Sequence, residues 1–205
     1  MHNICNFLDS VPDLVGAAID APLIIKNPSG NRPCEEGLNR VYGSRWAGCY
    51  PSNLSLYPNS SSVQLSKHLQ SSGFHHLGNP VNERWQLECY PHPAIIELFK
   101  LQRRLDYKKK TVDNRRRGQI QLANYIKGLV HHPVLQLELP QDLELFFDPA
   151  RINTLGGQAL KHNEDALDAT ICLFFCGLYA FDQPVQIFGD ISTGYIIVPQ
   201  GTSPL

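Results

Sequence analysis

The feature that most constrains the fold is the segment 161–181, KHNEDALDATICLFFCGLYAF. Its apolar residues recur every three or four positions, which places them in one stripe along a helix: Leu167, Ile171, Phe174 and Leu178. From Ile171 onward the other faces of this helix are apolar as well. The segment therefore predicts a helix that packs against neighbours on several sides.

Two aspartates stand at the head of this apolar run. Asp165 and Asp168 are three residues apart, so they are neighbours on one helix face. Two carboxylates held close together near a core repel each other unless a cation or a proton lies between them. The dipole of a helix that begins at 161 would reduce this cost. Capping of the helix by Asn163, Glu164 and Asp165 is an alternative explanation, but it does not account for Asp168.

A third carboxylate, Asp20, follows the apolar stretch 14–19, which reads as a buried strand. A strand-end aspartate facing a pair of helix aspartates can hold two divalent cations against a phosphodiester. Magnesium suits such a set of oxygen ligands. Glu88, at the end of the strand pattern 84–90, is a candidate further ligand. A place on the solvated face of an edge strand explains Glu88 equally well.

The remaining pattern alternates strands and helices, which predicts an α/β fold with a mixed sheet. Residues 26–60 are rich in Pro, Gly, Asn and Ser and predict a long functional loop with a short helix near 35–42. Further elements are expected as helices at 61–71, 93–99 and 113–130, and as strands at 185–188 and 195–198. Residues 131–149 are expected to be irregular or to carry a short helix near 142–147.

Length and composition fit one domain over residues 1–205, at 23.0 kDa and a net charge of −1. The apolar run 169–181 is too short to span a bilayer, so we expect no membrane association. The N-terminus lacks the layout of a signal peptide. Six cysteines without a CxxC pair then indicate reduced thiols and a cytoplasmic protein.

Basic residues gather between positions 103 and 117. This segment holds eight of the 18 Lys and Arg residues and only two acidic residues. Such a patch can follow a phosphate backbone, and Tyr107 offers a ring on which a base could stack. A solvated helix face is the alternative. The residues expected to contact nucleic acid are Lys108, Lys109, Lys110, Arg115, Arg116 and Arg117.

Several stretches together resemble the domain-of-unknown-function family 429, a predicted nuclease family of the ribonuclease H-like superfamily. They are IDAPL (19–23), NPSGNRPCEEGLNR (27–40), ECYPHPAIIELF (88–99), LDYKKK (105–110), KHNEDALDATIC (161–172) and GYIIVP (194–199). The resemblance implies a ribonuclease H-like mixed sheet flanked by helices. It also implies Mg²⁺ or Mn²⁺ as cofactor, with Asp20, Asp165 and Asp168 as metal ligands and catalytic residues, joined by Glu88.

Members of that family usually begin with a strand that carries a Gly-x-Asp-Gly motif, followed by a hairpin. Only nineteen residues precede Asp20 here, and they contain no such motif. We therefore expect a sheet without those first strands and weak or no phosphodiesterase turnover. Three functions stay open: a metal-dependent nuclease-like protein, a non-catalytic binding module that keeps the fold, and a phosphate- or sugar-handling enzyme. The sequence leaves the oligomeric state open.

Overall fold

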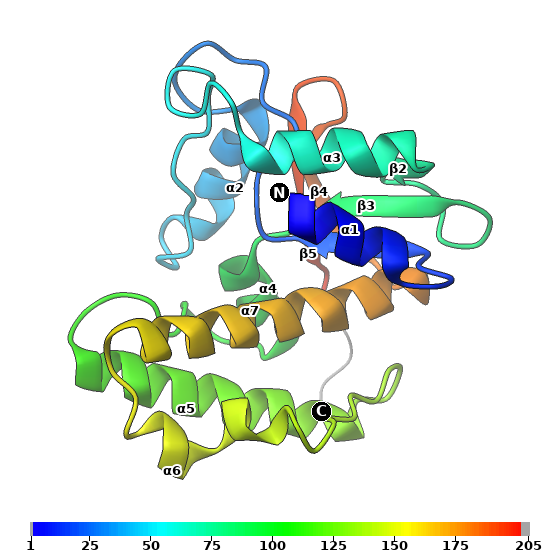
Figure 1. Ribbon diagram of the computed structural model, residues 1–205. Helices are drawn as coiled ribbons and strands as arrows, with labels where there is room; N and C mark the ends of the chain where they lie inside the picture. Colours follow the sequence, from blue (N-terminus) through cyan, green and yellow to red (C-terminus); the bar gives the residue numbers. More distant parts are fainter. Residues whose placement is uncertain (1, 202–205) are drawn as a thin grey trace.

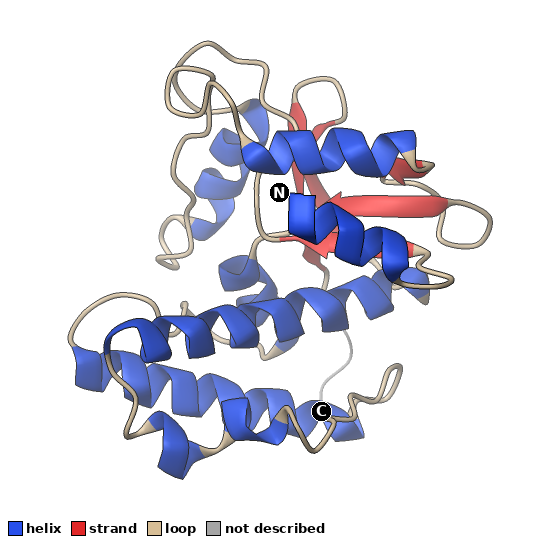
Figure 2. Ribbon diagram, viewed as in Figure 1, coloured by secondary structure: helices blue, strands red, loops and turns tan. Residues whose placement is uncertain are grey.

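The computed structural model describes residues 2–201 and has an α/β fold with two small sheets (Figures 1 and 2). The helices are α1 (His2–Ser10), α2 (Pro33–Tyr42), α3 (Ser61–Ser71), α4 (Pro91–Leu98), α5 (Val112–Gly128), α6 (Pro149–Ile152) and α7 (Gly157–Ala180), with 3-10 turns η1 (Leu129–His131) and η2 (Glu144–Phe147). The strands are β1 (Gly16–Ile19), β2 (Phe74–His76), β3 (Arg84–Glu88), β4 (Val185–Asp190) and β5 (Gly194–Pro199).

The first sheet is parallel and has the strand order β1-β3-β2. Its register places Ile19 opposite Glu88. The second sheet is the antiparallel pair β4-β5, and a single bridge between Cys89 and Ile197 connects the two sheets. The single mixed sheet expected from the sequence is thus divided, because apolar alternation identifies strands and does not identify their partners.

The parallel sheet lies between two layers of helices (Figure 1). On one face, side chains of α1 and α3 pack with the sheet around Leu69 and Phe74. On the other face, Leu87 of β3 packs with Phe175 of α7. The far side of α7 packs against α4 and α5 in the largest apolar cluster. Helix α7 is therefore the central helix of the fold, as its all-round apolar character predicts.

Helix α7 begins at Gly157, earlier than the predicted start at 161. Asp165 and Asp168 consequently lie in the helix interior, well past its first turn. The capping explanation for Asn163, Glu164 and Asp165 is therefore wrong, and the helix dipole cannot offset the charge of the aspartates. The prediction begins four residues late because residues 157–160 (GQAL) are too few to show an apolar repeat.

Most other predicted elements are present with shifted ends. Helix α3 matches its prediction, and α4 begins at Pro91 rather than Pro93. Strand β2 was not predicted, because three residues are too few to display an alternating pattern. Among residues 2–201, no helix combines the length and the apolar character needed to span a membrane.

Candidate functional site

Two aspartates from distant parts of the chain share one lysine. The ammonium of Lys108 lies 2.8 Å from Oδ2 of Asp168 and 3.7 Å from Oδ2 of Asp20. The Asp168 side chain is 8% exposed, whereas that of Asp20 is 36% exposed. The site is thus buried on the α7 side and open to solvent on the β1 side.

The pleat of the sheet explains why Asp20 faces α7. Successive side chains of a strand point to opposite faces. Cys89, one residue beyond Glu88, contacts Cys172 of α7 with a distance of 3.1 Å between the sulfurs. Asp20 follows Ile19, the partner of Glu88 in the register, so Asp20 shares the Cys89 face of the sheet.

A tight approach between α5 and the preceding loop holds Tyr107 and Lys108 in place. A Cβ atom on Gly118 would lie 2.5 Å from the carbonyl oxygen of Asp106, so only glycine fits there. The side chain of Gln119 donates to the carbonyl of Tyr107 at 3.3 Å. From this position the buried Tyr107 hydroxyl donates to Oδ1 of Asp168 at 2.6 Å.

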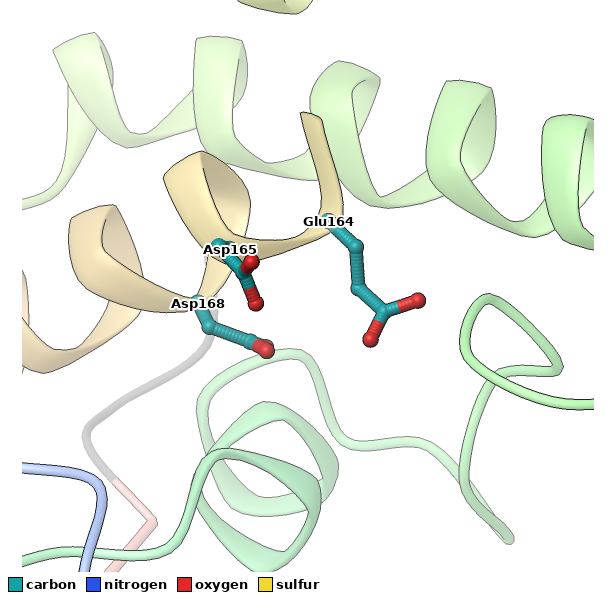
Figure 3. A group of neighbouring side chains, drawn as sticks. All are labelled: Glu164, Asp165 and Asp168. Atoms are coloured by element: carbon teal, nitrogen blue, oxygen red, sulfur yellow. The ribbon is translucent and has the colours of Figure 1, made fainter. Parts of the chain in front are cut away.

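Three carboxylates of α7 form an acidic cluster next to this lysine. Glu164, Asp165 and Asp168 each offer an oxygen, and these atoms all lie within 4.8 Å of one another. Figure 3 shows the three side chains leaving one stretch of α7. Glu164 and Asp168 are buried and Asp165 is exposed. Such a group of oxygens could hold a metal ion.

Basic side chains pair with the carboxylates of this cluster. Lys161 lies 2.8 Å from Oε1 of Glu164 and 2.6 Å from Oδ1 of Asp165. Arg115 lies 3.4 Å from Oε2 of Glu164. The ammonium groups of Lys161 and Lys108 therefore supply the positive charge that a bound metal ion would otherwise supply.

The ionisation of these groups reflects burial opposed by the nearby charges. Burial raises the pKa of Asp20 to about 6 against the effect of Lys108, and the charge of Asp168 adds to the rise. Burial also raises the pKa of Asp168, although Lys108 and Tyr107 favour its charged form. For Lys108, burial acts to lower the pKa, but the two aspartates outweigh it and the pKa rises. Lys108 is thus held as a cation.

Glu88 does not join this group. Its side chain lies on the opposite face of β3, where its two oxygens accept hydrogen bonds from Arg32 at 2.6 and 3.0 Å. The backbone N–H of Leu23 donates to the same carboxylate at 2.8 Å. Glu88 is buried and β3 is the central strand, so the edge-strand explanation is wrong. Because its oxygens already have partners, we leave Glu88 out of the candidate site.

Half of the eight basic side chains in the segment 103–117 already form ion pairs within the fold. Lys108 pairs with the aspartates, Lys110 with Asp106 and Arg115 with Glu164. Arg116 donates to the carbonyl of Leu155 and to Asp113. Within residues 2–201, no ion pair forms at Arg103, Arg104, Lys109 or Arg117. Tyr107 is fully buried, so the expectation that its ring stacks on a base is wrong.

The structure adds three residues that the sequence pattern did not single out for this site. Glu164 completes the acidic cluster, Lys161 neutralises it, and Tyr107 supports Asp168. The spacing of Lys161, Glu164 and Asp168 at intervals of three and four could have revealed one helix face. The reach of Tyr107 to Asp168 is a long-range contact that no local pattern encodes.

The chain also matches a known family. The sequence profile of the family described as "Protein of unknown function (DUF429)" matches residues 2–178. No curated protein and no solved structure matches the chain. The matched range contains β1, all but the last two residues of α7, and every residue of the candidate site. The chain therefore belongs to the DUF429 family.

Proposed function

We propose that this protein is a metal-dependent, nuclease-like protein that acts on nucleic acid phosphodiesters, with a ribonuclease H-like arrangement of acids. The observation that carries the proposal is the meeting of Asp20 and Asp168 around Lys108. These aspartates come from a strand end and from a helix packed against that strand. Asp168 lies beside the two further carboxylates of α7, Glu164 and Asp165, and Asp20 is linked to this group through Lys108.

The donor set suits a divalent cation. Every candidate ligand is a carboxylate oxygen, which is the ligand type that Mg²⁺ and Mn²⁺ prefer. Asp168, Glu164 and Asp165 would hold the ion, and Asp20 would complete its surroundings from the open side. A bound divalent cation would polarise the phosphate and make a coordinated water more acidic.

The chain's own residues would support this chemistry in defined ways. Tyr107 donates to Oδ1 of Asp168 and leaves Oδ2 for a cation. Lys108, which neutralises Oδ2 here, would become available to pair with a phosphate oxygen once its carboxylates bind a cation. Lys161 has the same relation to Glu164 and Asp165.

A non-catalytic binding module is the second candidate, and one observation favours it. Lys108 and Lys161 already balance the acidic side chains, so the cluster is electrostatically complete without a metal. In that case the acids and lysines would only tie α7 to β1 and to the 105–108 loop.

Titration calorimetry with Mg²⁺ and Mn²⁺ and a phosphodiesterase assay separate the two candidates. For the nuclease-like protein we expect metal binding and weak metal-dependent cleavage of labelled oligonucleotides, both lost in Asp168→Asn. Asp142→Asn is a matched control, because Asp142 is exposed on the loop before η2. A parent protein that neither binds these ions nor cleaves any oligonucleotide would favour the binding module.

A further inference from the structure

Two large aromatic side chains are exposed on the loop that follows α2. Trp46 is 49% exposed and Tyr50 is 75% exposed. Trp46 also has a φ of 61°, in a backbone region that bulky residues rarely adopt. The loop is held firmly, because Ala47 N–H donates to the carbonyl of Tyr42 at 3.0 Å and Cys49 N–H to Asn39 at 2.8 Å. The backbone that carries the two exposed rings is thus tied to α2.

Cations from the basic segment lie against both rings. The Arg103 guanidinium is 4.5 Å from the centre of the Trp46 ring, and the Lys110 ammonium is 5.9 Å from it. The Lys109 ammonium is 4.4 Å from the centre of the Tyr50 ring and donates to the Tyr50 hydroxyl at 2.5 Å. We call these five residues the aromatic platform. It alternates π-faces with positive charge.

The platform is continuous with the candidate site. Lys108, Lys109 and Lys110 are consecutive, and they contact Asp168, Tyr50 and Trp46 in that order. Tyr90 connects the two regions: its hydroxyl donates to the carbonyl of Gly48 at 3.2 Å, and its ring contacts His92, which in turn contacts Tyr107. The segment 108–110 therefore links the platform to the acids of the candidate site.

A basic pocket extends the platform on its other side. It has a volume of about 460 Å³ and lies between the loop 101–106 and α5. Arg103 and Lys110 line it together with Arg104 and Arg117, and Asp106 is its acidic residue. Four cations around one open pocket match the charge of a phosphodiester backbone.

We propose that the aromatic platform binds single-stranded nucleic acid, with bases stacked on Trp46 and Tyr50 and the backbone directed toward Asp168. Stacking needs unpaired bases, whose faces are free, whereas the bases of a duplex are stacked on each other. Alternating aromatic rings and cations are the means by which proteins hold single strands. This inference rests on the proposed function, because it names the substrate class of the same site.

Fluorescence anisotropy tests the platform without requiring catalysis. The full chain is titrated in EDTA against labelled single-stranded DNA, single-stranded RNA and a DNA duplex of about 12 nucleotides. We expect the single strands to bind more tightly than the duplex. Tyr50→Leu and Trp46→Leu should each weaken single-strand binding about tenfold, which corresponds to ~1.4 kcal/mol.

Matched variants distinguish stacking from general effects. Tyr57→Leu removes another exposed tyrosine, 49% exposed, away from the basic segment, and should bind like the parent. Tyr50→Phe keeps the ring and should retain most of the affinity. Tyr50 is so exposed that its replacement should leave the thermal unfolding midpoint unchanged, which keeps the test valid even if Trp46→Leu fails to fold.

The outcomes separate this inference from the proposed function. Single-strand binding that depends on Tyr50, with or without cleavage in Mg²⁺, supports the platform. Cleavage by a protein whose Tyr50→Leu variant binds single strands like the parent overturns the platform and leaves the nuclease proposal standing. Absence of single-strand binding, or a preference for the duplex, also overturns it. A difference between the DNA and RNA arms identifies the sugar that the site prefers.

Discussion

Two groups of paired charges lie at the carboxyl ends of neighbouring strands, and they differ in how many hydrogen-bond partners their charged side chains have and in how exposed these side chains are. At the end of β3, Arg32 binds Glu88 through two nitrogens and Glu35 through its Nε, and it is 1% exposed. We call these three residues the Arg32 network. Beyond the end of β1, Lys108 makes one short contact with Asp168 and one long contact with Asp20, whose side chain is partly open.

The difference indicates separate roles for the two pairs. In the Arg32 network the planar guanidinium matches the carboxylates, and the backbone N–H of Leu23 and of Ser52 fill remaining oxygen positions. Each of the two carboxylates already accepts three hydrogen bonds from within the fold. A lysine is a point charge on a flexible stem, so Lys108 can move away when another cation or a phosphate arrives. The first pair holds the fold, and we propose that the second serves function.

Breaking the Arg32 network should have the largest effect. Arg32→Met leaves Glu88 and Glu35 buried without a counter-charge, which should lower the free energy of unfolding by about 3–5 kcal/mol. Urea denaturation followed by circular dichroism measures this change. Arg40→Met, on the exposed side of α2, should change stability by only a few tenths of a kcal/mol. A loss below about 1 kcal/mol in Arg32→Met would contradict the structural role.

The sequence predicted which elements carry the acids of the candidate site, but it did not predict the partners of these acids. Apolar patterns identified the strand before Asp20 and the helix that carries Asp165 and Asp168, because burial leaves a periodic trace. The sequence offers Glu88 as a candidate further ligand because it too ends a strand. Its exclusion follows from the register of β1 against β3 and from Arg32, a residue in a loop without periodicity. Such long-range pairing has no local signature.

The same limit applies to the neighbours of the site. The charges at positions 103–117 were visible in the sequence, but their mutual pairing depends on how α5, α7 and the 105–108 loop pack. Trp46 and Tyr50 lie in a long loop whose backbone follows no repeating pattern, so their exposure beside Lys109 and Arg103 emerges only in three dimensions. The predicted start of α7 is late for a related reason, since residues 157–160 are too few to show a repeating pattern.

The pH dependence of stability tests the buried surroundings of the candidate site, where His92 lies. His92 is buried against Tyr90 and Tyr107, and burial, with help from Lys108, lowers its pKa from 6.5 to about 3. The unfolded chain binds this proton below about pH 6.5, whereas the folded protein does not. His92 therefore leaves the free energy of unfolding unchanged above about pH 6.5 and lowers it progressively as the pH falls from 6.5 toward 3.

Denaturation curves between pH 7 and pH 4 measure this effect. His92 should account for a loss of at most about 1.4 kcal/mol per pH unit over that range. In His92→Gln the dependence should become shallower by that amount, whereas His131→Gln, at an exposed histidine, should follow the parent. Parallel curves for His92→Gln and the parent would show that His92 does not stay neutral in the fold.

Removing the lysine between the aspartates should have the smallest effect on stability and the clearest response to metal. Lys108→Met should lower the free energy of unfolding by ~1–3 kcal/mol in EDTA. This loss is below that of Arg32→Met, because Asp20 is partly open to water and Tyr107 still donates to Asp168. Adding Mg²⁺ or Mn²⁺ should stabilise Lys108→Met more than the parent, since the ion no longer competes with the ammonium.

The double variant Lys108→Met with Asp168→Asn carries neither charge. It should therefore be less destabilised than the sum of the two single variants, and it should lose the response to metal. A Lys108→Met protein as unstable as Arg32→Met and indifferent to divalent cations would make the two ion pairs equivalent, and the acids around Lys108 would then belong to the framework of the fold.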